Sequence, residues 1–403
     1  MLRFQPLPIT LLFILGFDAM SQLSIQKNLK NAAIIGVFIV SLFVPFFIGI
    51  FEQGSIVSDV EKRKLAKFPQ LPTDVDTFIE MPIKIDQYFS DHFGLRQTLT
   101  NTYKTLKTKL GDSPTDDVTI GKDGWLFLGS NKVGYNKFGD PIGDFKNKNL
   151  YSDEQLKQIT HYLNGQYKWL QKQGIAYVFF IAPNKHTIYS DKLPAYITKV
   201  NQLSATDQLI QSLRANTNIP VIDLRDRLIQ AKAKQLYYKG DTHWNHEAAN
   251  IAQHQVMQVI ESLFQGKIKA ELFEIIDPKT GFNGDLAQFI GAKNYDDFSP
   301  RPELGKTCKV KTKQNNTKGT NYTTTCSSQK LKTIIYGDSF FKNFMMQYFS
   351  VKFNQATFLW RKPHYQSLKQ EIKLHKPDIV VEEWVERHLP YVPRDYDIFD
   401  RVR

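Results

Sequence analysis

Two short stretches of the sequence hold the residue types that can activate a serine hydroxyl. Ser339 stands in "IIYGDSFF", where an apolar run stops at Gly-Asp-Ser as a buried strand would end in a tight turn. Asp241 and His243 lie two residues apart in "GDTHWN", with His243 ninety-six residues before Ser339. A serine is a poor nucleophile until a base accepts its proton, and an aspartate that holds histidine Nδ1 makes the imidazole such a base. The pattern therefore predicts a triad of Ser339, His243 and Asp241.

Each stretch also has a simpler interpretation. Gly-Asp-Ser occurs in many turns, and an aspartate before a helix is most often a cap or a satisfied surface group. A metal site formed by Asp241, His243 and His246 is a second chemical interpretation. Spacings of two and three residues match no familiar zinc pattern, and His246 is more simply the first residue of the next helix. We therefore expect neither a metal nor another cofactor.

The segments around these residues predict the elements that position them. Continuous apolar runs, typical of strands buried on both faces, alternate with amphipathic stretches typical of helices. This alternation predicts a three-layer α/β/α domain in which helices cover both faces of a parallel sheet. Ligands of such sheets bind beyond the carboxyl ends of the strands, so we expect Ser339, Asn184 and Glu382 at one rim. The predicted strands are residues 175–183, 219–224, 332–337, 355–360 and 378–384.

Four regions follow one another along the chain. Residues 1–31 form an amino-terminal segment, 32–51 an apolar span, 52–114 a charged and helical lead-in, and 115–403 the α/β domain. The α/β domain opens with "VTIGKDGWLFLGS", where apolar runs flank Gly-Lys-Asp-Gly. This pattern predicts a β-hairpin.

The span from Ala32 to Phe51 predicts a membrane anchor. It carries no charged residue and has the length that a helix needs to cross a hydrocarbon core. Lys27 and Lys30 precede it and Glu52 follows it, so the positive-inside rule places residues 1–31 in the cytoplasm and the rest of the chain outside. A cleaved signal peptide is the alternative, but no small-residue cleavage site follows the span. We expect an uncleaved, single-pass anchor in the cytoplasmic membrane, with the α/β domain on its periplasmic side.

The two cysteines, Cys308 and Cys326, agree with export. They bracket a polar, threonine-rich tract that is expected to be an exposed loop. Disulfides persist in oxidising compartments, and a bridge here would close a ring of about eighteen residues. We therefore expect a Cys308–Cys326 disulfide.

Composition limits the classes of function. With 42% hydrophobic residues, the 403-residue chain can build a full-sized core, so global disorder is excluded. The net charge of +12 suits a polyanion, an anionic membrane surface or an acidic substrate. No zinc finger, helix-turn-helix signal or basic-aromatic array is recognisable, so nucleic acid is not an expected partner.

Six short stretches resemble the alginate O-acetylation proteins of the AlgX/AlgJ type. In chain order they are "EKRKLAKFP", "FSDHFGLR", "GKDGWLFL", "APNKHTIY", "GDTHWN" and "IIYGDSFF". The catalytic domain of that family is SGNH-hydrolase-like, with the aspartate and histidine before the serine, as Asp241 and His243 are before Ser339. The resemblance implies that Ser339 carries the acetyl group, that His243 is its base and that Asp241 orients His243.

The resemblance also frames three further candidates. The Ser339 backbone N–H and the Asn184 side-chain amide are candidate oxyanion-hole donors, with a turn residue after a strand as the alternative for Asn184. Trp244 is a candidate to stack on a sugar ring, with a buried core tryptophan as the alternative. Arg361 is a candidate to bind a uronate carboxylate, with an ordinary surface arginine as the alternative.

Partners and layout are likewise implied by the resemblance. Family members transfer acetyl groups to an exopolysaccharide outside the cytoplasmic membrane, beside a membrane-bound acyltransferase that delivers the acetyl group. We recognise no carbohydrate-binding module after the α/β domain, which favours the shorter, membrane-anchored AlgJ-like layout. Two alternatives stay open at this point: an acetyl esterase, and a non-catalytic scaffold or glycan-binding subunit.

Overall fold

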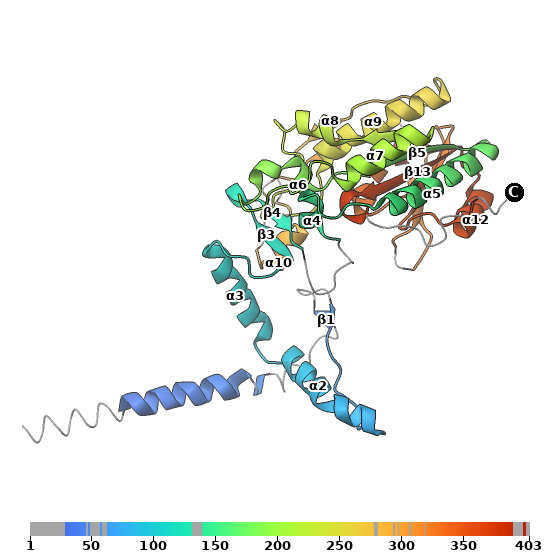
Figure 1. Cartoon of the computed structure of the whole chain (residues 1–403). Coiled ribbons are helices and arrows are strands. Elements are labelled where there is room, and N and C mark those ends of the chain that lie inside the picture. Colours follow the sequence, from blue (N-terminus) through green and yellow to red (C-terminus); the bar gives the residue numbers. More distant parts are fainter. Residues whose placement is uncertain are drawn as a thin grey trace, which may run out of the picture. The chain divides into compact units, whose positions relative to one another are not determined.

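The computed structural model divides into two compact units, Met1–Tyr103 and Lys104–Arg403 (Figure 1). The residues that the structure describes are 29–45, 47–48, 57–58, 63–130, 139–277, 281–292, 295–296, 298–305, 308–317, 319–389 and 398–399.

The first unit contains short, separate elements. A helix covers residues 29–45, and strands β1 (Val57–Ser58) and β2 (Arg63–Lys64) form an antiparallel pair. Helix α2 (Val75–Asp91) comes next, and helix α3 (Arg96–Lys109) crosses into the second unit. None of the helices in the described part of the chain has both the length and the apolar character needed to span a bilayer. The predicted anchor, 32–51, includes residues 46 and 49–51, which lie outside the described residues, so it stays a prediction.

A seven-stranded sheet forms the centre of the second unit, in the order β6-β5-β13-β11-β12-β10-β9. Its first five strands are parallel, as predicted. They are β6 (Val221–Asp223), β5 (Ala176–Ala182), β13 (Ile379–Val385), β11 (Lys332–Tyr336) and β12 (Gln355–Leu359).

The last two strands correct the prediction of a purely parallel sheet. β10 (Tyr322–Thr325) pairs antiparallel with β12, and β9 (Lys311–Gln314) pairs antiparallel with β10. Both lie in the tract expected to be a loop. Threonine is β-branched and suits a half-buried edge strand, and the Thr323 and Thr357 hydroxyls lie 3.0 Å apart across the β10–β12 pair. The polarity of this tract favours an exposed loop, and its β-branched threonines are too weak a signal to indicate the strands.

Helices cover both faces of the sheet, as the predicted three layers require. One core lies between the sheet and helices α8 (Arg225–Gln230), α9 (His246–Phe264) and α11 (Met346–Lys352). The other lies beneath α5 (Asp153–Lys172), α7 (Ala205–Asn216) and α12 (Tyr365–His375). β5 contributes side chains to both cores, because Val178 and Phe180 face the first while Tyr177 and Phe179 face the second.

Smaller elements frame the carboxyl ends of the parallel strands. The predicted hairpin is present as β3 (Val118–Ile120) and β4 (Leu126–Leu128), joined by the 3-10 turn η1 (Lys122–Gly124). It packs against α10 (Asp285–Phe289). The remaining elements are α4 (Pro141–Phe145), α6 (Lys185–Ile188), η3 (Ser190–Lys192), β7 (Glu274–Ile276), β8 (Arg301–Glu303), the π-helical turn η4 (Phe341–Met345) and η5 (Glu386–His388).

The cysteines join the added edge strands to the rest of the domain. Cys308 and Cys326 form a disulfide with Cα atoms 5.8 Å apart. Cys326 directly follows β10, so the bridge fixes the start of the segment that contains β9.

Candidate active site

Ser339 lies where β11 ends and a helix begins. The Asp338 side chain accepts a hydrogen bond from the Phe340 N–H at 2.8 Å, and the Asp338 N–H donates to Glu383 Oε2 on β13 at 2.9 Å. A Cβ at Gly337 would lie 2.9 Å from Glu383 Oε2, so glycine is needed where the turn approaches β13. Ser339 is the first helical residue, and an N–H in that position has no intrahelical acceptor. The turn therefore presents both the Ser339 hydroxyl and its N–H beyond the sheet.

His243 joins the serine to Asp241. His243 Nε2 lies 2.6 Å from Ser339 Oγ, and His243 Nδ1 lies 2.6 Å from Asp241 Oδ1. The His243 main-chain N–H also donates to Asp241 Oδ1, at 2.8 Å. Because a carboxylate only accepts, Nδ1 carries the proton and Nε2 is left to accept one from the serine. The three residues predicted from the sequence thus lie in one hydrogen-bonded chain.

A buried lysine, Lys185, forms hydrogen bonds with the catalytic loop, residues 238–243. Lys185 Nζ donates to the main-chain carbonyls of Tyr238, Lys239 and Asp241 at 3.0, 3.1 and 2.5 Å. Its ammonium lies 5.4 Å from the ring centroid of Phe127 on the β3–β4 hairpin. Burial lowers the pKa of Lys185 to about 8. Lys185 thus fixes the loop that carries Asp241 and His243.

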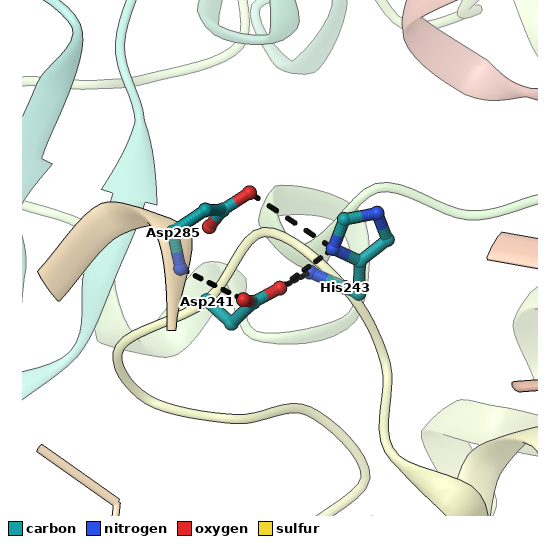
Figure 2. A group of neighbouring side chains, drawn as sticks. All are labelled: Asp241, His243 and Asp285. Atoms are coloured by element: carbon teal, nitrogen blue, oxygen red, sulfur yellow. Dashed lines mark hydrogen bonds and ion pairs between the residues drawn. The ribbon is translucent and has the colours of Figure 1, made fainter. Parts of the chain in front are cut away.

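A second carboxylate, that of Asp285, lies beside the triad (Figure 2). Its Oδ2 is 3.9 Å from His243 Nδ1, and its main-chain N–H donates to Asp241 Oδ2 at 2.8 Å. Its side chain accepts from the Thr242 N–H at 2.8 Å and from the Thr242 hydroxyl at 2.6 Å. Sequence reasoning missed Asp285, because it begins a five-residue helix in a polar segment without a motif.

Electrostatics favour the charge distribution of a serine–histidine–aspartate relay. Burial raises the pKa of Asp241, but the charge of His243 and hydrogen bonds outweigh this and bring the pKa to about 2. Burial lowers the pKa of His243, but the charge of Asp241 outweighs this and raises the pKa above its usual 6.5. Burial, followed by the charge of Asp241, raises the pKa of Asp285. Asp241 is therefore ionised at neutral pH, and the imidazolium is stabilised.

The metal interpretation is not assembled as the sequence suggested. Among the described residues, the group whose ligand atoms lie within 4.8 Å of one another is Asp241, His243 and Asp285, without His246. His246 begins α9, and its Nδ1 lies 2.9 Å from the Gln347 amide nitrogen. Both ring nitrogens of His243 are engaged in the relay, so the arrangement fits proton transfer.

Asn184 lies at the same rim as the triad. It is the N-cap of α6, directly after β5, and its side chain is buried. The Asn184 N–H donates to Glu386 Oε2 at 2.7 Å, and Arg387 donates to Asn184 Oδ1 at 3.3 Å. Because arginine only donates, the amide oxygen must face Arg387, which leaves the Asn184 NH₂ directed elsewhere. Asn184, Arg387 and Thr242 line one small cavity.

The structure corrects the expectation that Trp244 stacks on a sugar. Trp244 is fully buried, and its indole N–H donates to the Phe340 carbonyl at 3.1 Å. A ring with no exposed face cannot meet a ligand. Trp244 instead ties the start of α9 to the helix that carries Ser339.

Two other residues have structural partners. Arg361 forms an ion pair with Glu371 at 2.7 Å, as the surface-arginine alternative supposes. Glu382 was expected at the rim but is buried within β13, where its carboxylate accepts hydrogen bonds from Gln166, Tyr177 and Trp384, each at 2.7 Å. A strand residue in the middle of a sheet faces a core, so its position near the strand end did not bring it to the rim.

A cavity of about 770 Å³ is lined in part by His246 and Phe344, and its described lining includes none of the three triad residues. It shares Phe344 with the site, since that ring lies 5.8 Å from the ring of His243. Tyr238 and Phe282 stack at 3.9 Å in its wall, and Arg301 and Lys342 bring positive charge. The described lining residues include no aspartate or glutamate; they are Tyr238, His246, Phe282, Ser299, Arg301, Pro302, Leu304, Val310, Thr312, Tyr322, Thr324, Lys342, Asn343, Phe344, Met346, Gln347, Ser350 and Val351.

The fold and the site are those of an SGNH-hydrolase-like α/β protein. Residues 118–356, more than half of the chain, match the family described as "SGNH hydrolase-like domain, acetyltransferase AlgX". The chain therefore belongs to this family, in agreement with the resemblance read from the six stretches.

Individual relatives agree with this assignment. The chain is 26% identical over 211 residues to the "Probable alginate O-acetylase AlgJ" of Pseudomonas fluorescens, covering 51% of this chain and 45% of that one. It is 25% identical over 224 residues to the protein of the same name from Pseudomonas aeruginosa, covering 54% and 52%. The chain thus spans about half the length of the curated relatives it matches. Bacillus cereus PatB1 is a solved structure with a similar fold, with a TM-score of 0.50 and 15% identity over 69% of this chain and 100% of that one.

Proposed function

We propose that this protein is an O-acetyltransferase that transfers an acetyl group through an acetyl-Ser339 intermediate to a hydroxyl of an exported polysaccharide. The observation that carries the proposal is the chain of two 2.6 Å contacts from Ser339 Oγ through His243 to Asp241. Family membership and the relatives named as alginate O-acetylases support it.

The reaction has two halves that use His243 in opposite directions. In the first, Ser339 Oγ attacks the acetyl carbonyl of the donor and His243 Nε2 takes the hydroxyl proton. The donor's leaving oxygen departs with that proton, which leaves acetyl-Ser339. In the second half, a sugar hydroxyl gives its proton to His243 and attacks the acetyl group. Ser339 Oγ then leaves and recovers the proton, so the enzyme is restored.

An oxyanion hole is needed for both halves. We assign its donors to the Ser339 N–H and the Asn184 NH₂, which the Arg387 contact leaves directed away from Arg387. Removing one such donor typically costs about 10²- to 10³-fold in kcat. Asn184→Ala should therefore lower kcat for a small acetyl ester to this extent with little change in KM.

The 770 Å³ cavity is the proposed acceptor site. The partly exposed rings of Phe282 and Tyr322 suit a sugar face, and the hydroxyl and amide groups of the cavity suit sugar hydroxyls. Within the described part of the chain, neither Arg301 nor Lys342 forms an ion pair, so both charges are available to an acidic sugar. An acidic polysaccharide is therefore the preferred acceptor class.

Location and partners follow from the sequence and remain part of the proposal. The span at 32–51 would anchor the chain in the cytoplasmic membrane, with the α/β domain outside. The Cys308–Cys326 disulfide supports an oxidising compartment. A membrane-bound acyltransferase would then supply the acetyl group from the cytoplasmic side.

The test uses the full-length protein with an activated acetyl ester and matched acidic and neutral oligosaccharides. We expect the acidic acceptor to be acetylated by the parent protein and not by Ser339→Ala. Arg301→Ala with Lys342→Ala should raise KM for the acidic acceptor, whereas the exposed Lys311→Ala on β9 serves as the matched control. Hydrolysis that no acceptor diverts would replace the transferase by an esterase, and the absence of any acetyl turnover would refute both.

A further inference from the structure

Asp285 lies outside the catalytic loop, but its segment is hydrogen-bonded to that loop. The Ala287 N–H donates to the Gly240 carbonyl at 2.9 Å, so the first turn of α10 is bonded to the loop. A Cβ at Gly284 would lie 2.0 Å from that carbonyl oxygen, so only glycine permits this approach. The position of Asp285 beside Asp241 is therefore fixed by the backbone.

The Asp285 carboxylate faces the same ring nitrogen as Asp241. Asp241 Oδ1 lies 2.6 Å from His243 Nδ1, and Asp285 Oδ2 lies 3.9 Å from the same atom. Thr242 links the two, because its hydroxyl donates to Asp285 Oδ2 and lies 3.2 Å from His243 Nδ1 (Figure 2 shows the carboxylates around the ring). Two negative charges thus border the nitrogen that stays protonated throughout the relay.

The other charged groups near His243 do not replace the negative charge of Asp285. Arg387, on η5, opposes protonation of His243. Lys185 and Asp296 both interact electrostatically with Asp241, and Asp296 accepts from the Lys239 and Gly240 N–H groups at 2.6 and 2.8 Å. Because the charge of Arg387 lowers the pKa of His243, a second carboxylate has a cation to offset.

We propose that Asp285 is a positioning residue of the relay, which holds Thr242 and adds the second negative charge that stabilises the His243 imidazolium when Ser339 loses its proton. This inference rests on the proposed function for its catalytic consequence. The Asp285 N–H bond to Asp241 survives substitution of the side chain, so a variant tests the carboxylate alone.

Asp285→Asn is the direct test, and Asp296→Asn is its control, because the Asp296 carboxylate also binds this loop, through the Lys239 and Gly240 N–H groups. In the full-length protein with a small acetyl ester, we expect Asp285→Asn to lower plateau kcat about tenfold with KM unchanged. This allows for screening, because 40% of the Asp285 side chain is exposed. The acid limb of the kcat/KM profile should move to lower pH, because loss of the charge lowers the pKa of His243. Asp296→Asn should leave the limb in place.

Three results would overturn the role of Asp285. The first is an Asp285→Asn variant with an unchanged acid limb and an unchanged plateau kcat. The second is an equal shift of the acid limb in Asp296→Asn. The third is an Asp285→Glu variant, which keeps the charge, with its acid limb shifted as far as that of Asp285→Asn. If Asp285→Asn does not fold, an NMR titration of His243 in the parent protein decides. Because Asp241 already raises the pKa of His243, the second step decides: a His243 signal that also follows the titration of Asp285 supports the proposal, and a titration in a single step contradicts it. The NMR readout needs no turnover, so a failure of the proposed function is seen separately.

Discussion

Replacing Lys185 by methionine removes the ammonium that holds three carbonyls of the catalytic loop. Methionine fills a similar volume, so the change tests the hydrogen bonds more than the packing. Each hydrogen bond from a charged group contributes about 1.5–3 kcal/mol, and the cost of burying the ammonium offsets part of the sum. Burial lowers the pKa of Lys185 to about 8, so the relieved cost is substantial, and the Lys239 carbonyl also accepts from the Leu126 N–H. We therefore expect Lys185→Met to lower the free energy of unfolding by about 2–4 kcal/mol, mainly from the Tyr238 and Asp241 carbonyls that lose this donor.

The assay is urea unfolding, with kcat for a small acetyl ester measured in the absence of urea. Because the loop carries Asp241 and His243, kcat should fall in the folded variant while KM changes little. Lys192→Met is the matched control, because Lys192 pairs with the exposed Asp123 and such surface pairs contribute little to stability. A loss below about 1 kcal/mol in Lys185→Met, together with unchanged kcat, would refute the claim that Lys185 fixes the loop.

Three further outcomes are expected. The acid limb of the kcat/KM profile should lie above pH 6.5, because only the neutral imidazole accepts the serine proton. Burial lowers the pKa of His243, but the charge of Asp241 outweighs it and raises this pKa. An acid limb below pH 6.5 would contradict the prediction. Trp244→Phe removes the hydrogen bond to the Phe340 carbonyl and part of a fully buried ring, and it should lower the free energy of unfolding by about 1–3 kcal/mol, measured by urea unfolding; an unchanged value would count against it. Replacing Cys308 and Cys326 together by serine should lower the unfolding free energy by about 3 kcal/mol, as the loop they close predicts, and unchanged thermal unfolding would argue otherwise.

The parallel core was predictable because burial leaves a direct trace in the sequence. The run 175–183 is apolar along its whole length, which is the pattern of a strand covered on both faces, and 378–384 contains the shorter apolar run Ile379–Val381. The turn at Gly337 likewise marked Ser339. Strands β9 and β10 leave no such trace, because all four residues of β9 are exposed and β10 is a polar strand that is only partly buried.

The rest of the site depends on contacts between distant segments. The sequence shows Asp241 and His243 together, but it does not show that residues 284–287 pack on their loop. The sequence does not show whether Trp244 contacts a sugar or packs in the core, because tryptophan suits both environments. Its complete burial in the structure shows that it packs in the core. Lys185 appears as a surface residue in the sequence, because a lysine is rarely buried without partners, and its partners here are carbonyls that no pattern reveals.

The most direct test of the central claim is the mass of the Ser339 peptide after brief incubation with an activated acetyl ester. The account predicts a peptide heavier by one acetyl group, which disappears when an acidic oligosaccharide acceptor is added and which does not form in Ser339→Ala. An unmodified Ser339 peptide in a sample that acetylates the acceptor would contradict it, because the acetyl group would then reach the sugar without passing through the serine.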